Sequence, residues 1–364
     1  MPSQSAVEKA LDRALRSAKA SPRTLDLASA RYVVFSDHHK GKRDGADDFT
    51  RCERAYVGAL KHYDRERFTL IVLGDAEELW ECQPKPVLRA YANILELERR
   101  FFPDRYLRVW GNHDDEWESP RRVRKHLWEF YPELEVLEAV CFAVTDQGTE
   151  LGTLFLAHGH QGSFFSDRLA GIAKIVVRLV WRTIQRLTRR PSTTPATDAC
   201  LRDEHDKAMY DWAAQQRGLV MIAGHTHRPV FNSKTHLQQL EEELRQFLDL
   251  PLNQEDASYG ARVAALRTEI EHVRAKDRQC EEAAGGAERG KPCYFNSGCC
   301  SFGDGDITGL EIVEGEIRLV RWPEDDGSLR PKVLARSGLR RVFEDLASLG
   351  AARDLPADRE VTPR

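Results

Sequence analysis

The sequence lacks the cysteine patterns of disulfide scaffolds and zinc knuckles. Its eight cysteines are scattered over 364 residues, and no two have the C-x-x-C spacing of a zinc site. Cys299 and Cys300 are adjacent, which is more typical of a packed loop than of a disulfide framework. We therefore expect a reducing, cytoplasmic compartment.

Membrane-spanning and secretory signals are also missing. No apolar run approaches the length needed to cross a bilayer, and the charged, helix-like N-terminal residues have no apolar signal-peptide core. The net charge of -4 gives no overall attraction to nucleic acid, and no strip of aromatic and basic residues is present. We expect no nucleic-acid partner, and a nuclease is disfavoured.

What the sequence does contain is an alternation of predicted strands and helices. Short apolar runs predicted as strands lead directly into polar clusters at residues 30–36, 68–73, 106–110, 150–157 and 219–223. Helical segments at 48–64, 86–102 and 121–131 separate several of them. Alternating strands and helices, with polar residues at the carboxyl ends of strands, predict an α/β layered fold.

Two stretches interrupt this alternation and are interpreted as helical insertions. The first contains a cationic amphipathic helix at 169–190, and the second has apolar residues at helical spacing on both sides of Pro251, which predicts a helical hairpin. The expected organisation is an N-terminal helix and connector (1–29), the first part of the catalytic core (30–163), a helical cap insertion (164–217), a core strand with its Gly-His-Thr-His motif (218–233), a helical hairpin insertion (234–291), the last part of the core (292–349) and a disordered tail (350–364).

The polar clusters contain the ligand types of a hydrolytic metal centre, namely carboxylate, imidazole and amide oxygen. In order, they are Asp37-His38-His39, Gly74-Asp75, Gly111-Asn112-His113-Asp114, His158-Gly159-His160, Gly224-His225-Thr226-His227 and Asn296-Ser297-Gly298. Asp37 and His39 are two residues apart, so at an extended strand end they point the same way. A carboxylate such as Asp75 can bridge two divalent ions. The alternative, that these are merely polar turns, requires six unrelated clusters to arise together by chance.

This ordered set resembles the calcineurin-like metallophosphoesterase superfamily over about residues 33–322. The resemblance implies a layered β-sandwich flanked by helices, carrying the two helical insertions. It implies one metal site formed by Asp37, His39, Asp75 and His227, and a second formed by Asp75, Asn112, His158 and His225. The implied cofactors are two divalent ions, with Mn²⁺ preferred and Fe, Zn or Mg as alternatives.

The reaction expected of such a centre is hydrolysis of a phosphoester. A hydroxide bridging the metals would attack phosphorus in line. His113 follows the implied ligand Asn112 and is the candidate general acid for the leaving oxygen. In the family, such a histidine pairs with an acid three residues after the bridging aspartate, and Glu78 occupies that position here.

Other polar residues near the clusters are expected to support the site or to contact the substrate. His38 and His160 are expected to lie behind the ligands or to face solvent, and Asp114 is expected to brace its loop. For Lys40, Lys42 and Arg43, contact with substrate phosphate and a solvated loop are both open. Asn296 is expected, with Ser297, to shape the wall of the site, and Arg43 and Asn296 are the candidate substrate-binding residues.

The motifs also favour one branch of the superfamily. Protein serine/threonine phosphatases carry an arginine in both the Gly-Asp and the Gly-Asn-His motifs, and both are absent here. The Gly-Asp-x-x-Glu-x-Trp pattern ending at Trp80 looks more like the UDP-2,3-diacylglucosamine pyrophosphatase branch. The chain departs from that branch at His113, where an arginine is usual, and in its His158-Gly159-His160 cluster, where His-Gly-Asp is usual.

We therefore predict a two-metal phosphoesterase that cleaves a phosphodiester or pyrophosphate bond in a small phosphorylated or lipid-linked substrate. One alternative is a UDP-2,3-diacylglucosamine-type lipid pyrophosphatase. Another is a metal-binding scaffold that acts through the hairpin at 234–291. The helix at 169–190 either packs on the core or binds a membrane surface peripherally, and the hairpin is interpreted as a packing or oligomerisation element, with a lid as the alternative.

Overall fold

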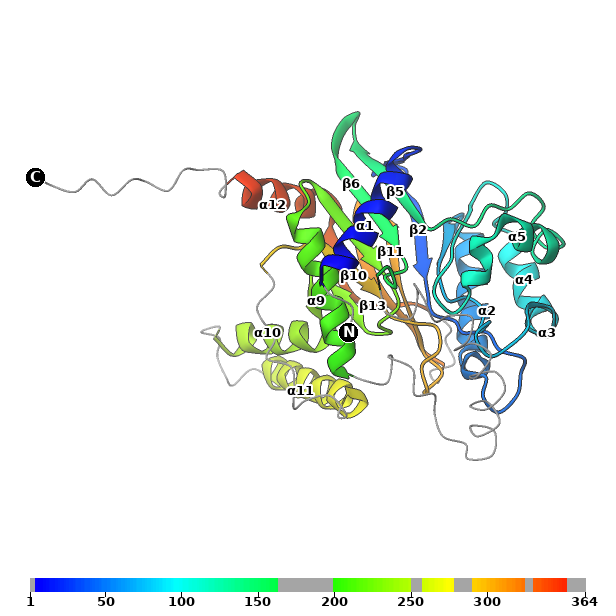
Figure 1. The fold of residues 1–364 in the computed structure, drawn as a ribbon. Helices are drawn as coiled ribbons and strands as arrows, with labels where there is room; N and C mark the ends of the chain where they lie inside the picture. Colours follow the sequence, from blue (N-terminus) through cyan, green and yellow to red (C-terminus); the bar gives the residue numbers. More distant parts are fainter. Residues whose placement is uncertain (1–3, 163–198, 250–256, 278–289, 325–329, 352–364) are drawn as a thin grey trace, which may run out of the picture.

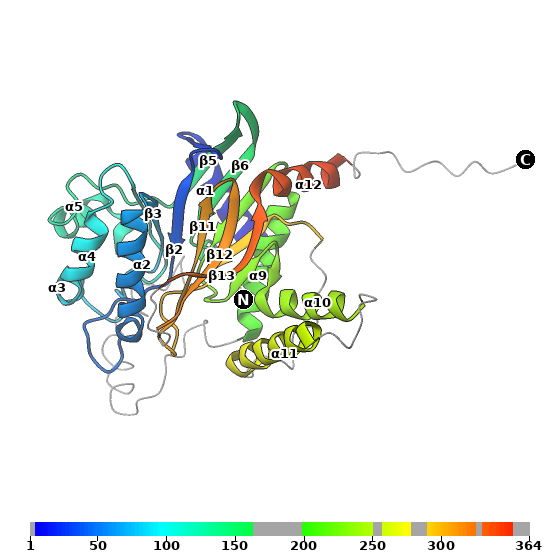
Figure 2. The same cartoon turned by 180° about the vertical axis from the view of Figure 1, so that it is seen from behind.

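Two β-sheets pack face to face at the centre of the molecule, and helices cover their outer faces (Figures 1 and 2). The computed structural model describes residues 4–162, 199–249, 257–277, 290–324 and 330–351. This four-layer arrangement confirms the predicted α/β fold with a layered β-sandwich flanked by helices. The predicted cationic helix at 169–190 lies outside the described residues.

The six-stranded sheet holds the first three predicted strands side by side. Its order is β13 (Lys332–Gly338), β12 (Glu316–Trp322), β11 (Ile307–Val313), β2 (Arg31–Phe35), β3 (Thr69–Leu73) and β4 (Tyr106–Val109). β2, β3 and β4 are parallel, so their carboxyl ends lie at the same edge. The helices on its outer side are α2 (Glu53–Arg65), α3 (Pro84–Ala90), α4 (Ala92–Arg99) and α5 (Pro120–His126), with 3-10 turns at Asp48–Arg51 and Asp115–Glu118.

The seven-stranded sheet supplies the remaining clusters. Its order is β1 (Arg23–Asp26), β5 (Ala139–Asp146), β6 (Thr149–Ala157), β7 (Leu219–Ala223), β10 (Tyr294–Ser297), β8 (Pro229–Phe231) and β9 (Lys234–Thr235). β6, β7 and β10 are parallel neighbours. The helices α1 (Gln4–Lys19) and α9 (Ala199–Gln215) cover the outer face, and α12 (Leu339–Ala351) contacts β6 and β7.

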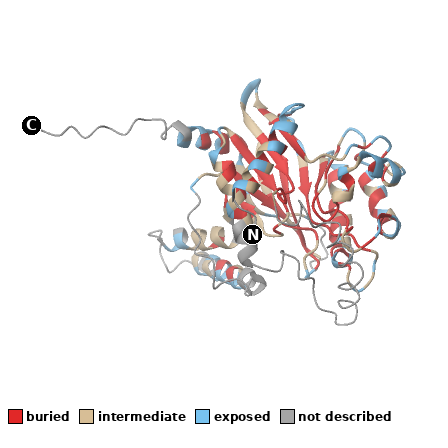
Figure 3. Ribbon diagram, viewed as in Figure 1, coloured by how far each residue is buried: buried red, intermediate tan, exposed pale blue. Residues whose placement is uncertain are grey.

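Two hydrophobic cores hold these layers together, and most strand residues at their centre are fully buried (Figure 3). One core fills the space between the sheets and under α1 and α9, and the other lies between the six-stranded sheet and α2–α5. All residues of β7 are buried, which explains its uninterrupted Leu-Val-Met-Ile-Ala sequence, since a strand covered on both faces needs no polar alternation.

Several elements differ from those expected from the sequence. The helical segment at 86–102 divides at Tyr91 into α3 and α4, and β1, β13 and α12 have no predicted counterpart. α9 lies in the stretch interpreted as a cap insertion, yet its Met209 and Trp212 are buried in the core between the sheets and their helices. Within the described residues, α9 is therefore the helix of the crossover connection between the parallel strands β6 and β7.

The helices α10 (His236–Asp249) and α11 (Ala257–Asp277) pack against each other in the region predicted as a helical hairpin. Their contact has its own small cluster of buried residues, Leu240, Leu266 and Ile270, separate from the two main cores. Within the described ranges, no helix is both long enough and apolar enough to cross a membrane.

Candidate metal centre

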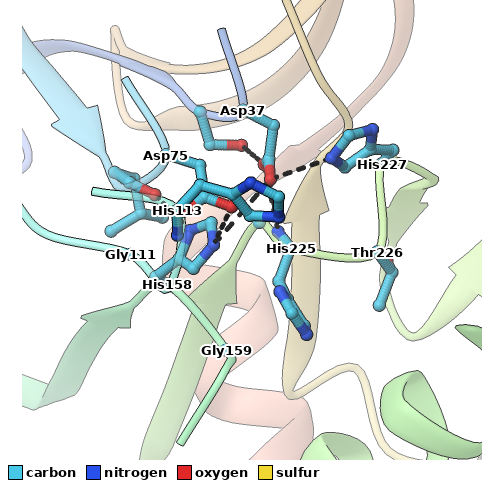
Figure 4. Close-up of polar contacts among 12 residues, drawn as sticks. Asp37, Asp75, Gly111, His113, His158, Gly159, His225, Thr226 and His227 are labelled. Atoms are coloured by element: carbon cyan, nitrogen blue, oxygen red, sulfur yellow. Dashed lines mark hydrogen bonds and ion pairs between the residues drawn. The ribbon is translucent and has the colours of Figure 1, made fainter. Parts of the chain in front are cut away.

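The predicted ligands meet where the strands of the two sheets end. Asp37 follows β2, Asp75 follows β3, His158 follows β6, and His225 and His227 follow β7. In Figure 4, the side chains of Asp37, Asp75, His158 and His227 converge from separate strands, and the ring of His225 turns away from Asp37. The structure thus brings together clusters that are up to 190 positions apart in the sequence, between Asp37 and His227.

The backbone at these positions adopts an unusual conformation. The φ angles of Asp37, His39, Asp75, His225 and His227 are 55°, 51°, 52°, 70° and 57°. Residues with side chains rarely adopt this left-handed region, and such strained positions tend to cluster at functional sites, where the surroundings hold them in place. This left-handed conformation turns the chain sharply after each strand, so that the loops bearing these residues meet in one small space.

One group of potential ligands contains Asp37, His39 and His227, whose ligand atoms all lie within 4.8 Å of one another. The His227 Nε2 atom is 3.2 Å from Asp37 Oδ1 and 3.0 Å from His39 Nε2. A carboxylate and two imidazoles at this spacing could hold a divalent ion.

A second group contains Asp75, His158 and His225. The His158 Nε2 atom is 3.1 Å from Asp75 Oδ2, and the Nδ1 atom of the same ring donates to the carbonyl oxygen of Leu73 at 2.8 Å. This backbone bond fixes the ring so that Nε2 faces Asp75. Asp75 Oδ2 is also 3.8 Å from His39 Nε2, so its carboxylate lies between the two groups.

The amide oxygen of Asn112 fits the same centre. Within the described part of the chain, its Oδ1 atom is buried and accepts no hydrogen bond. Buried polar atoms normally have a partner, and a cation would provide one here. The backbone N–H of the next residue, His113, donates to Asp75 Oδ1 at 2.7 Å, which holds this loop against the carboxylate. The combined set of carboxylate, imidazole and amide donors suits Mn²⁺, Fe or Zn.

Glu78 contacts His113, as expected, and it also contacts a predicted ligand. Its Oε2 atom is 2.7 Å from His113 Nδ1 and 3.2 Å from His39 Nδ1. Burial would raise the pKa of Glu78, but the charge and hydrogen bond of His113 outweigh burial and lower the pKa to about 2. Burial would lower the pKa of His113, but the charges of Glu78 and Asp75 raise it. The pair therefore favours an anionic Glu78 beside a protonated His113.

Trp80 adds a contact that the motif alone did not reveal. Its ring stacks on His113 with a centroid distance of 4.4 Å and an interplanar angle of 19°. With Glu78 on Nδ1 and Trp80 on one face, the imidazole of His113 is held in a single orientation. Its Nε2 atom is then the nitrogen left to act on a substrate.

Other polar groups hold the loops that bear the ligands. The carboxylate of Asp114 accepts hydrogen bonds from the backbone N–H groups of Gly111 and Ala76, at 2.6 and 2.9 Å, so Asp114 braces its loop as predicted. Asp37 accepts a short hydrogen bond from Ser36 and two contacts from the backbone N–H of His225, at 3.0 and 3.2 Å. These bonds tie the loops to one another beneath the ligands.

The two candidate substrate-binding residues have structural contacts. Asn296 is fully buried, and its Nδ2 atom donates to the Gly224 carbonyl oxygen at 2.7 Å, so it supports the loop behind His225. The guanidinium of Arg43 donates to both oxygens of Glu53, at 2.6 and 2.8 Å, and lies over the ring of Tyr91. These contacts hold Arg43 against α2 and α3 and do not bring it to the metal ligands.

Lys40 is neither solvated nor placed to meet a phosphate, so both interpretations of this residue were wrong. Its side chain is fully buried, and its Nζ atom lies 3.1 Å from Glu98 and 3.5 Å from Glu77. Glu77 in turn binds Arg108 through a short ion pair. A buried network of opposite charges therefore lies under the loops that carry His39, Glu78 and Asp114.

The two remaining histidines of the clusters are buried behind the ligands. His38 packs against Tyr56 at a ring centroid distance of 4.6 Å, and burial lowers its pKa to about 3. His160 lies 4.8 Å from the ring of Trp110 and 5.5 Å from that of His158, and burial lowers its pKa to about 3 as well. Both are neutral at physiological pH, and neither faces solvent.

His205 on α9 was not predicted as part of the site. Its ring meets that of His225 edge to face, with centroids 5.2 Å apart. No sequence signal marked it, because α9 was interpreted as part of an insertion and His205 stands outside every motif. Only the packing of α9 over β7 brings it to the centre.

Comparison with known proteins agrees with this geometry. The sequence model of the family described as calcineurin-like phosphoesterase matches residues 30–229, more than half of the chain. The chain belongs to the calcineurin-like phosphoesterase family. As a member of this family, it is a metal-dependent phosphoesterase, and the Asp and His groups described above are its candidate ligands for divalent ions.

Two further comparisons add little to this assignment. The calcineurin-like chain matches a crystal structure of a dimetal phosphatase from Danio rerio with a TM-score of 0.31 and 11% identity, over 80% of this chain and 95% of that one. A likeness of this size does not bear on the function. A search of curated proteins found no match.

Gly111 is expected to be essential for the site. A Cβ atom added there would lie 2.2 Å from Asp75 Oδ1 and 2.7 Å from the His158 ring, far inside van der Waals contact. Gly111→Ala should displace Asp75 and lose most metal binding, measured by calorimetric titration with Mn²⁺. Gly45→Ala is the control, since a Cβ there meets nothing within 4 Å. Full Mn²⁺ binding by Gly111→Ala would contradict this packing.

Metal binding should release protons and strengthen with pH. Burial would lower the pKa of His39 and His158, but the Glu78 hydrogen bond to His39 and the Asp75 charge beside His158 raise both to about 9. Below pH 9 a cation must displace these protons, so affinity should rise by about tenfold per pH unit for each proton released. Titrations with Mn²⁺ between pH 6.5 and 8.5, in buffers of different ionisation enthalpy, measure this. An affinity independent of pH would contradict it.

Proposed function

We propose that this protein is a two-metal phosphoesterase that hydrolyses a phosphodiester or pyrophosphate bond. The observation that carries the proposal is the position of Asp75, whose carboxylate lies 3.1 Å from His158 and 3.8 Å from His39. Asp75 belongs to two overlapping groups of potential ligands, one with His158 and His225 and one with His39 and His113. A carboxylate in that position can serve two ions at once.

The donors divide between the two ions. Asp37, His39 and His227, together with Asp75, would hold the first ion, and Asn112, His158 and His225, together with Asp75, would hold the second. When bound, such ions supply Lewis acidity to the phosphoryl oxygens and a hydroxide nucleophile at neutral pH. Mn²⁺ is our first choice for both sites, since the donor set mixes imidazole with oxygen ligands.

His113 would supply the proton for the leaving oxygen. Its Nδ1 atom is held by Glu78 and its face by Trp80, which leaves Nε2–H as the donor. The charges of Glu78 and Asp75 raise the pKa of His113 against the effect of burial, which favours its protonated, proton-donating form. A general acid poised in this way contributes about 10²- to 10⁴-fold to the rate.

The preference for a diester or pyrophosphate rests on charge near the leaving group. The two motifs lack the arginines of the protein phosphatases, and Leu79 and Trp80 follow Glu78 while Asp114 follows His113. Leu79 is fully buried, Trp80 stacks on His113, and Asp114 faces backbone N–H groups. None of them offers a guanidinium to the dianion of a phosphate monoester. A phosphodiester carries one negative charge fewer, so the missing guanidinium matters less for its binding.

The assay that tests the proposal compares phosphate esters directly. Purified protein loaded with Mn²⁺ is offered a chromogenic phosphodiester, the matching monoester, nucleotide pyrophosphates and a UDP-linked lipid pyrophosphate. The last substrate is included because the pattern from Gly74 to Trp80 resembles the lipid pyrophosphatases. We expect diester or pyrophosphate hydrolysis that a chelator abolishes. Protein that holds two metals but hydrolyses none of these substrates would overturn the proposal.

A further inference from the structure

The loop that carries His225 and His227 is held by a carboxylate from α9. Asp206 lies on the buried face of this helix, one turn before Met209 and two turns before Trp212 and Ala213, which pack into the core. Its side chain is fully buried and contacts the loop at 224–228. A buried carboxylate is costly unless donors surround it.

Asp206 receives three such donors. Its Oδ1 atom accepts hydrogen bonds from the Thr226 hydroxyl at 3.1 Å and from the Tyr294 hydroxyl at 2.7 Å. Its Oδ2 atom lies 3.1 Å from the Arg228 guanidinium. Thr226 lies between the two predicted ligands His225 and His227, and Arg228 follows the second of them. Asp206 therefore contacts the residue before His227 and the residue after it, and so holds the loop on both sides of this ligand.

The loop needs this support because its backbone is strained. His225 and His227 have φ angles of 70° and 57°, which persist only when neighbouring contacts enforce them. Thr226 is the one residue between them, and its side chain lies in the polar layer formed by Asp206 and Asn296, whose Nδ2 atom is 3.1 Å from the Thr226 hydroxyl oxygen. Removing residues that orient metal ligands typically weakens metal affinity by about 10- to 100-fold.

We propose that Asp206 is a positioning residue for the metal centre. Through the hydroxyl of Thr226 and the guanidinium of Arg228, it holds His225 and His227 in the conformation that binds both ions, and it makes α9 a part of the active site. This inference rests on the proposed two-metal function, because it concerns the two ions that share Asp75.

Four variants test the proposal by calorimetric titration of metal-free protein with Mn²⁺. Asp206→Asn and Thr226→Val should each weaken Mn²⁺ binding by about 10- to 100-fold. Thr226→Ser keeps the hydroxyl and should bind with close to wild-type affinity. Tyr63→Phe is the control, since it removes a hydroxyl bonded to the remote buried carboxylate of Glu311 at 2.6 Å, and it should lower the melting temperature without changing Mn²⁺ binding.

The outcomes separate this inference from the proposed function. Wild-type affinity in folded Asp206→Asn and Thr226→Val would overturn the positioning role while leaving the phosphoesterase intact, and so would equal losses in Thr226→Val and Thr226→Ser. If Asp206→Asn does not fold, the two Thr226 variants decide. Wild-type protein that binds no Mn²⁺ would overturn the metal centre itself, and the positioning role with it.

Discussion

Replacing Asp75 with asparagine is expected to reduce phosphoester hydrolysis to background and to weaken Mn²⁺ binding by more than about 100-fold, beyond the loss typical of residues that only orient a ligand. The asparagine keeps the shape of the side chain and an oxygen for the N–H of His113, which is 2.7 Å away. It loses the negative charge and the second oxygen, which face His158 and His39. Both metal sites should therefore fail together.

A buried carboxylate elsewhere in the fold provides the matched control. Glu311 on β11 is buried and bonded to Tyr63, so Glu311→Gln makes the same chemical change away from the ligands. It should retain Mn²⁺ binding and hydrolysis. Activity and calorimetric titration are measured on both variants, and an Asp75→Asn protein that keeps either property would contradict the shared role of Asp75.

His113→Ala should show an effect that depends on the leaving group. For a phosphodiester with an alkoxide leaving group, the loss in kcat is expected to be about 10²- to 10⁴-fold, because that oxygen departs only when protonated. For a 4-nitrophenolate leaving group, which departs without a proton, the loss should be small. The comparison isolates proton donation, since both esters share the same phosphoryl group and nucleophile.

The control for this variant is His126→Ala, which removes an imidazole from α5 on the outer side of the six-stranded sheet. Titration with Mn²⁺ should show that His113→Ala still binds metal, because the proposed ligand sets of both ions are complete without His113. Equal losses for the two esters would contradict a role for His113 as general acid.

The sequence predicted the parts of the site that depend on local order. Each of the strands β2, β3, β6 and β7 ends directly at a polar cluster, and within each sheet the parallel neighbours place their clusters at the same edge. The pairing of Glu78 with His113 followed from the family resemblance, and the atoms lie 2.7 Å apart. Motifs at strand ends are readable because the strand fixes where the next side chains point.

The parts that depend on tertiary packing were not predictable in this way. Lys40 and Arg43 belong to one charged stretch, yet Lys40 is fully buried between Glu77 and Glu98, while Arg43 binds Glu53 on α2. Their partners lie up to 58 positions away, and nothing local distinguishes the two cations. α9 was assigned to an insertion, so the approach of Asp206 to Thr226 was hidden as well.

The metal content of the protein tests the central claim most directly. Protein reconstituted with Mn²⁺, freed of excess metal and analysed by mass spectrometry should contain two ions per chain, and anomalous diffraction should place them about 3.5–4 Å apart with Asp75 between them. One ion or none per chain, or two ions that do not share Asp75, would contradict the account.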